Sequence, residues 1–185
     1  MSMRQEIEQN FAVLETAKET IYQTIADLPQ EVLTKKPAAD QWSISDLVHH
    51  LMLVEQFAMT QFQQTQHQKI KKTWIDRIKF LMSKIALDTG QKITVPVVDV
   101  DPLNIPAELP DVQQKWTDVR IEFKARLDSL SDEDLTYCYF SHPYAGNFTC
   151  QDGLIFLIKH WTHHQPQWRK LLATTMIEMD TDGKS

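Results

Sequence analysis

The chain has 185 residues, of which 42% are hydrophobic and only four are glycine, and its formal charge is −6 at pH 7. This length suits one domain with a substantial core, and the scarcity of glycine argues against a barrel or sandwich of short strands. The acidic balance disfavours nucleic acid as a partner, because phosphate binding requires a basic surface. The chain contains no apolar run near the ~18 residues of a membrane span and no signal-peptide core. We therefore expect a cytoplasmic protein without a membrane partner.

The first half of the chain predicts three helices. The first covers residues 7–28, where apolar side chains recur at helical spacing until Pro29 ends the pattern. Ser43 can cap a second helix, because Asp46 follows three residues later in the position of a capping-box partner. Residues 69–87 continue in helical rhythm through Trp74, Ile78, Leu81 and Ile85. These patterns are typical of an all-α fold.

A proline-rich segment follows these helices. Residues 91–111 show no helical period, and their prolines remove backbone donors at close intervals. We interpret the segment as a loop of about twenty residues, and its apolar ITVPVV stretch favours an ordered flap. The next helix is expected over residues 112–130. A short turn then leads to a connector over residues 137–147, which is rich in aromatic and turn residues.

The last predicted helix contains the most informative residues. It begins after Thr149, which can cap it together with Asp152, and it is strongly apolar. His160 and His164 are four positions apart, so both imidazoles lie on one face of the helix, as in a metal site. A single buried histidine is more often a hydrogen-bonded core residue. Two ligands are also too few for a catalytic zinc site, which takes three from the protein and keeps one position open.

The second helix offers a third ligand. His50 lies close to the apolar stripe of that helix and is expected to face the core, whereas His49 is rotated away from it. Glu55 either supports a ligand histidine or faces solvent, and we favour solvent. Cys138 and Cys150 have neither metal-site nor disulfide spacing, so we expect free thiols, with a catalytic thiol as the lesser alternative.

Three stretches together resemble the DinB-like (DinB/YfiT) family of metal-binding four-helix bundles. They are Trp42-Ser43 through His50-Leu51 to Glu55, His142-Pro143-Tyr144-Ala145-Gly146 leading to Thr149, and His160 through His163-His164 to Gln167. The resemblance covers most of the chain in order and spacing. It implies a four-helix bundle. The proline-rich loop read from the sequence then lies between the second main helix, which Ser43 caps, and the third main helix, over residues 112–130. Residues 1–178 are then predicted to form a single domain, and residues 179–185 a flexible tail.

The resemblance also implies a site. In this family, one histidine of the second helix and a His-x3-His pair of the last helix bind a divalent metal, commonly zinc or nickel. These positions fall on His50, His160 and His164, with His163 as a neighbouring histidine that is not a ligand. The chain departs from the family's His-His-Arg-Gly-Gln by reading His-His-Gln-Pro-Gln. Pro166 is therefore expected to kink or loosen the turn that carries His164.

Two functions follow as hypotheses. The family includes thiol S-transferases that use low-molecular-weight thiols such as bacillithiol, and a mycothiol-dependent maleylpyruvate isomerase, and its members are often dimers. The first hypothesis is thus a homodimeric, divalent-metal-dependent enzyme with a small-molecule substrate, either a thiol S-transferase with a low-molecular-weight thiol as co-substrate or a hydrolase. The alternative is a non-catalytic metal-binding or stress-associated helical bundle, in which the metal only stabilises the fold. A third interpretation is that the histidines are only packed core residues.

Overall fold

The computed structural model describes residues 2–65, 68–89, 100–102, 107–142 and 144–182, with side chains as far as residue 174. The fold is mostly helical, as expected. Its α-helices are α1 (Met3–Ile25), α2 (Gln30–Thr34), α3 (Ile44–Thr65), α4 (Trp74–Asp88), α5 (Leu109–Ser129) and α6 (Cys150–Asp182). Its strands are β1 (Ile70–Lys71), β2 (Tyr137–His142) and β3 (Gly146–Thr149), which form an antiparallel sheet in the order β1-β2-β3.

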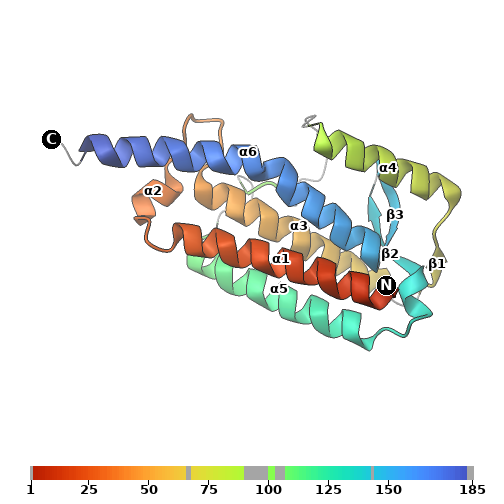
Figure 1. The fold of residues 1–185 in the computed structure, drawn as a ribbon. Coiled ribbons are helices and arrows are strands. Elements are labelled where there is room, and N and C mark those ends of the chain that lie inside the picture. The colour runs from red at the N-terminus through yellow and green to blue at the C-terminus, as the bar shows by residue number, and fades with distance from the viewer. Residues whose placement is uncertain (1, 66–67, 90–99, 103–106, 143, 183–185) are drawn as a thin grey trace.

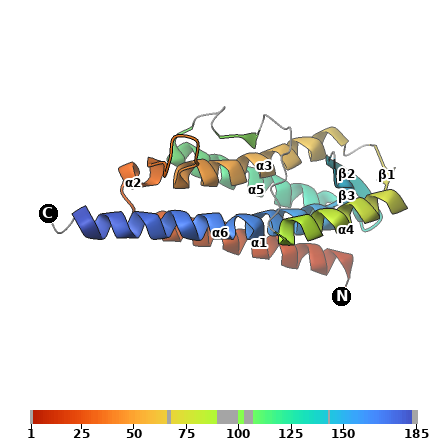
Figure 2. The ribbon, with the colours of Figure 1, turned by 90° about the horizontal axis from the view of Figure 1, so that it is seen from above.

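The long helices α1, α3, α5 and α6 lie side by side, and α4 lies outside them against α6 and β3 (Figures 1 and 2). Their apolar faces form two buried clusters. One lies near the sheet and includes Phe62 and Phe123, and the other lies toward α2 and includes Leu47 and Trp116. The histidines of interest come from α3 and α6, which pack against each other. The long helices therefore fix the positions of the candidate site.

Two reciprocal caps set where the histidine-bearing helices begin. The backbone N–H of Ser43 donates a hydrogen bond to Asp46 Oδ2 at 2.9 Å, and the backbone N–H of Asp46 donates one to Ser43 Oγ at 3.1 Å. Thr149 and Asp152 repeat the arrangement at the start of α6, at 3.0 and 3.3 Å. Both predicted caps are confirmed. Because each cap satisfies amide groups that the first helical turn leaves unpaired, it favours the start of the helix at that residue.

The structure differs from the expected elements in three places. The helical pattern expected over residues 69–87 begins only at Trp74, because Thr73 caps α4 and Ile70–Lys71 forms β1. The helix expected over residues 112–130 begins at Leu109, because Pro110 occupies its first turn, where a missing N–H costs nothing. The connector over residues 137–147 forms β2, a turn and β3, and most of β2 is buried. Residues 91–99 and 103–106 of the predicted flap lie outside the described residues. The all-α prediction therefore holds for the helices but misses the small sheet.

The last helix passes through the position of Pro166 without ending there. α6 extends from Cys150 to Asp182, beyond the predicted domain boundary at residue 178. The kink at Pro166 and the flexibility of residues 179–185 stay predictions. Within the described residues, we find no helix whose length and hydropathy would let it cross a membrane.

Gly146 provides a test of how closely the hairpin approaches α4. Its φ is +81°, and a Cβ at this position would lie 2.7 Å from Asp76 Oδ1 and 3.1 Å from Asp76 Cα. The neighbouring Asn147 N–H donates to the same Oδ1 at 2.9 Å. We expect Gly146→Ala to lower the free energy of unfolding by about 1–3 kcal/mol, because it adds backbone strain and a clash. Urea unfolding measures this, and an unchanged stability would contradict the close approach.

Candidate metal centre

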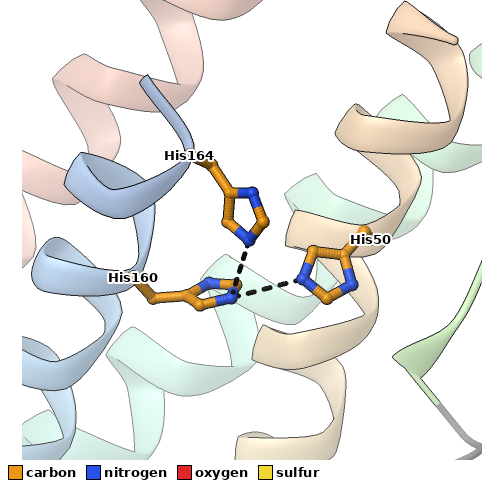
Figure 3. Close-up of side chains that lie close together, drawn as sticks. All are labelled: His50, His160 and His164. Carbon is orange, nitrogen blue, oxygen red and sulfur yellow. Dashed lines mark hydrogen bonds between the residues drawn. The ribbon is translucent and has the colours of Figure 1, made fainter. Parts of the chain in front are cut away.

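Three histidine side chains converge between α3 and α6 (Figure 3). His160 Nε2 lies 3.2 Å from His50 Nε2 and 3.2 Å from His164 Nε2. One ligand atom from each residue lies within 4.8 Å of the other two. His160 and His164 reach this point from successive turns of α6, and His50 reaches it from α3. The structure thus brings together the three histidines that the sequence singled out.

The outer ring nitrogens determine the tautomers of two of these histidines. His50 Nδ1 lies 2.7 Å from the backbone oxygen of Val100, and His164 Nδ1 lies 3.0 Å from Gln167 Oε1. A carbonyl oxygen only accepts hydrogen bonds, so each Nδ1 carries the proton and donates it. Each Nε2 therefore presents a lone pair to the centre. An N–H at His160 Nε2 can donate well to only one of these two lone pairs. The other lone pair is then left without a good hydrogen-bond donor.

Desolvation keeps the cluster neutral, with His50 buried and His160 and His164 partly exposed. Desolvation lowers the pKa of His50, lowers that of His160 well below its ordinary value of 6.5, and lowers that of His164 to about 4. The neighbouring imidazoles add to the shift of His160, because a second positive charge at this distance is unfavourable. Neutral imidazole is the form that binds metals, so the site is ready for a cation near neutral pH.

Aromatic rings enclose the cluster on two sides. The ring of Trp42 lies 4.6 Å from that of His50 and 6.1 Å from that of His164, between centroids. Phe156 lies parallel to His160 at 6.4 Å. His142, from the hairpin, contacts Phe156 at 5.3 Å between ring centroids, so His142 supports this wall. These rings pack against the imidazoles and cover part of the cluster.

The donor set fits a divalent metal. Metal–nitrogen bonds of ~2.0–2.1 Å place neighbouring ligand atoms of a tetrahedron about 3.3 Å apart, close to the two Nε2 separations here. Imidazole nitrogens suit zinc, nickel and copper. The hydrogen bonds from His50 and His164 to carbonyl oxygens are the orienting contacts that ligand histidines in metal sites usually make. Three nitrogens from the protein would leave a further coordination position for another molecule.

The other two histidines near the site point elsewhere. His163 Nδ1 lies 3.2 Å from the backbone oxygen of Leu87, at the end of α4, in agreement with its expected place outside the cluster. His49 is 4% exposed, so the expectation that it faces away from the core is wrong. The reason is that α3 packs against α5 as well as α6, which buries more of its surface than one apolar stripe indicates.

Glu55 does not face solvent as expected, since it is 4% exposed. Arg120 binds both of its carboxylate oxygens, through Nη2 at 2.6 Å and through Nε, and Trp116 Nε1 donates to Oε2 at 2.7 Å. Arg120 Nη1 also reaches Glu15 at 2.8 Å, and Lys18 pairs with Glu15 at 3.3 Å. This buried ion-pair network joins α1, α3 and α5. The sequence holds a signal for both residues: Glu55 follows the apolar run Leu51–Val54, and Arg120 lies four residues after Trp116 and three before Phe123, on the apolar face of its helix.

The ion-pair network lies close to the histidines. A small cavity of about 20 Å³ has Glu55, Arg120 and His160 among its lining residues. This volume holds about one water molecule, and the polar lining would give that water hydrogen-bond partners. No hydrogen bond joins Glu55 to His50, His160 or His164 within the described residues. The carboxylate therefore does not orient a ligand histidine directly.

The remaining candidates from the sequence lie apart from the cluster. Cys138 and Cys150 are buried and free of disulfide bonds, as predicted. Burial raises the pKa of Cys138 to about 11 and also raises that of Cys150, so both thiols are poor nucleophiles, which argues against a catalytic thiol. Tyr144 is exposed and contacts the ring of His142.

Long helices that direct three imidazoles to one point are typical of metal-binding helical proteins. The chain belongs to the DinB superfamily, because the model of that family matches residues 14–167. The chain is also similar to the uncharacterized protein YuaE of Bacillus subtilis (strain 168). The two are 25% identical over 162 residues, which cover 88% of this chain and 93% of the relative. No solved structure matches the chain.

The metal-free protein is expected to lose stability as the pH falls from 6.5 to about 4. The folded protein holds the pKa of His164 at about 4, whereas the unfolded chain binds this proton near the ordinary value of 6.5. Between these values the unfolded state binds more protons, so stability rises with pH by about 1.4 kcal/mol per pH unit for each such proton. Urea unfolding in the presence of a chelator measures the slope. His164→Asn should flatten it, and an equal slope in the variant would contradict the prediction.

Proposed function

We propose that His50, His160 and His164 bind a divalent metal, zinc or nickel, and that the protein is a metal-dependent enzyme with a small-molecule substrate. The observation that carries this proposal is the convergence of Nε2 lone pairs whose opposite nitrogens are hydrogen-bonded to carbonyl oxygens. When bound, such a metal supplies Lewis acidity, which makes a thiol or a water nucleophilic near neutral pH. The proposed reaction is thiol S-transfer with a low-molecular-weight thiol as co-substrate, or hydrolysis.

In this proposal, the chain's own residues orient the site and cover part of it. The carbonyl oxygens of Val100 and Gln167 hold His50 and His164 in the ligand tautomer. The rings of Trp42 and Phe156 provide apolar walls on which a substrate can rest. We also include in the proposal the four-helix bundle formed by α1, α3, α5 and α6. The homodimer, the cytoplasmic location and the absence of a nucleic-acid partner stay predictions.

The alternative function is a non-catalytic metal-binding bundle. The two functions differ in whether a coordination position is open to small molecules. The test is to load the purified protein with cobalt(II), whose absorption spectrum reports its ligands, and to add a low-molecular-weight thiol. An open position predicts a new thiolate-to-cobalt charge-transfer band that saturates with thiol. The metal-loaded protein is then assayed for thiol consumption with an electrophile and for ester hydrolysis.

The variants separate the outcomes. His163→Ala should keep the cobalt spectrum and its response to thiol, because His163 turns toward Leu87. His50→Ala should lose both. A wild-type protein that binds cobalt but shows no response to thiol or to ester substrates would favour the non-catalytic bundle. A wild-type protein that binds no divalent metal would contradict the metal site itself.

A further inference from the structure

Helix α4 carries two apolar faces. Its inner face contacts α6 and β3 through buried residues that include Asp76, Phe80 and Leu87. Its outer face carries six large apolar side chains that are 47% to 70% exposed: Trp74, Ile75, Ile78, Leu81, Met82 and Ile85. At 100° per residue these six positions fall within one stripe about 120° wide, opposite the buried face. Soluble monomers rarely expose a continuous apolar stripe of this kind unless it has a binding role.

In the sequence, the residues of this outer stripe indicate only a helix. Helical spacing alone does not say which face of that helix is buried. In the ribbon, α4 lies at the margin of the molecule, and none of the other described helices lies over its outer side (Figure 1). Single exposed apolar residues elsewhere, such as Ile121 on α5, form no such stripe. The outer face of α4 therefore requires its own explanation.

The charges around the stripe identify what it can bind. Residues 69–88 contain six lysines or arginines and two aspartates, a net charge of +4, in a chain whose total is −6. Both aspartates are engaged, because Asp76 caps α4 through Thr73 and Asp88 pairs with Lys159. Among the cations, Lys72 is engaged as well, because it pairs with Asp152 at 2.7 Å. On the helical wheel, Arg77 borders the stripe on one side and Lys79 borders it on the other. Neither of these two side chains has an ion-pair partner in the part of the chain that the structure describes.

A second copy of this face is a poor partner for it. Both borders of the stripe are basic, so a symmetric pairing of two α4 helices brings cation against cation whether they run parallel or antiparallel. Like charges placed opposite each other at the rim of an interface oppose association. An anionic lipid surface meets both requirements at once, because its acyl region accepts Trp, Ile, Leu and Met side chains while its headgroups attract lysine and arginine.

We propose that the outer face of α4 is a docking surface for anionic lipid bilayers, with the stripe inserted at the headgroup boundary and Arg77 and Lys79 against the phosphates. This contact is peripheral and needs no spanning helix. It departs from the expectation of no membrane partner, which rested on the absence of an apolar run long enough to span. The proposal does not depend on the metal site, so either one can fail alone.

The test is co-sedimentation of the full chain with vesicles. One set contains phosphatidylcholine alone, and the other contains phosphatidylcholine and phosphatidylglycerol in equal parts. The Ile78→Glu/Leu81→Glu variant removes the apolar stripe, and Arg77→Glu/Lys79→Glu reverses the borders. Ile121→Glu is the control, because Ile121 is also an exposed apolar residue, 65% exposed against 52% for Ile78 and 53% for Leu81, but lies on α5. All four substituted side chains of α4 are exposed, so circular dichroism and thermal unfolding should match the wild type.

The expected result is binding of the wild type and of Ile121→Glu to the anionic vesicles only, decreasing with added salt. Each α4 variant should bind at least about tenfold more weakly. Failure of the wild type to bind anionic vesicles would overturn the proposal. If sedimentation velocity then showed self-association that Ile78→Glu/Leu81→Glu abolishes, the face would be an interface between copies of the chain. Vesicle binding that the α4 variants leave unchanged would also overturn the proposal that the outer face of α4 docks on lipid.

Discussion

Replacing His160 by alanine is expected to lower the affinity for zinc or nickel by at least about 100-fold. His160 Nε2 lies at the centre of the cluster, 3.2 Å from the Nε2 atoms of His50 and His164. Without it, the remaining two nitrogens come from different helices and leave the metal with too few protein ligands. Metal competition titrations against a chromophoric chelator measure the affinity, and mass spectrometry of metals measures the content of the purified protein.

His163→Ala is the matched control for this prediction. It removes an imidazole from the same helix, but one whose Nδ1 faces the Leu87 carbonyl. The control should bind metal like the wild type. A second readout is thermal unfolding, because a metal that binds only the folded protein stabilises it by about 2.7 kcal/mol when present at 100 times its dissociation constant. Equal metal-induced stabilisation of wild type and His160→Ala would contradict the site.

Replacing Arg120 by methionine is expected to lower the free energy of unfolding by about 3–5 kcal/mol. Arg120 is 3% exposed and binds both carboxylate oxygens of Glu55. The substitution leaves the Glu55 carboxylate buried with Trp116 as its remaining hydrogen-bond donor, and the loss of the guanidinium also leaves Glu15 without its strongest partner. Urea unfolding at pH 7 measures the change.

The control for Arg120→Met is Arg126→Met on the same helix. Arg126 is 28% exposed and pairs with Glu122, four residues earlier on α5 and 46% exposed. Because this pair is accessible to solvent, the replacement should cost less than about 1 kcal/mol. The Glu55→Gln/Arg120→Met double variant should recover part of the lost stability, because it removes the unpaired charge. A double variant as unstable as Arg120→Met would show that lost packing, rather than a buried charge, accounts for the effect.

Glu55, His49 and the strand β2 show where sequence patterns fall short. Glu55 reads as a solvent-facing carboxylate because its partner Arg120 is 65 residues away in the chain. The sequence pattern predicts that His49 turns away from the core, because one apolar stripe implies one buried face. In the structure, both α5 and α6 cover α3. The strand β2 reads as a connector, because its burial comes from elements distant in sequence. In each case the missing information is the identity of a distant neighbour.

The sequence alone determined the features that depend on neighbours a few residues apart. Those were the caps at Ser43 and Thr149, the helices that follow them, and the pairing of His160 with His164 on one face, because capping and helical periodicity act within about one turn. The order and spacing of these motifs also indicated the family. Only the tertiary structure decided that His50 meets His160, that Glu55 is buried against Arg120, and that the stripe of α4 stays outside. These outcomes depend on which helices pack together, and therefore on contacts summed over the whole chain.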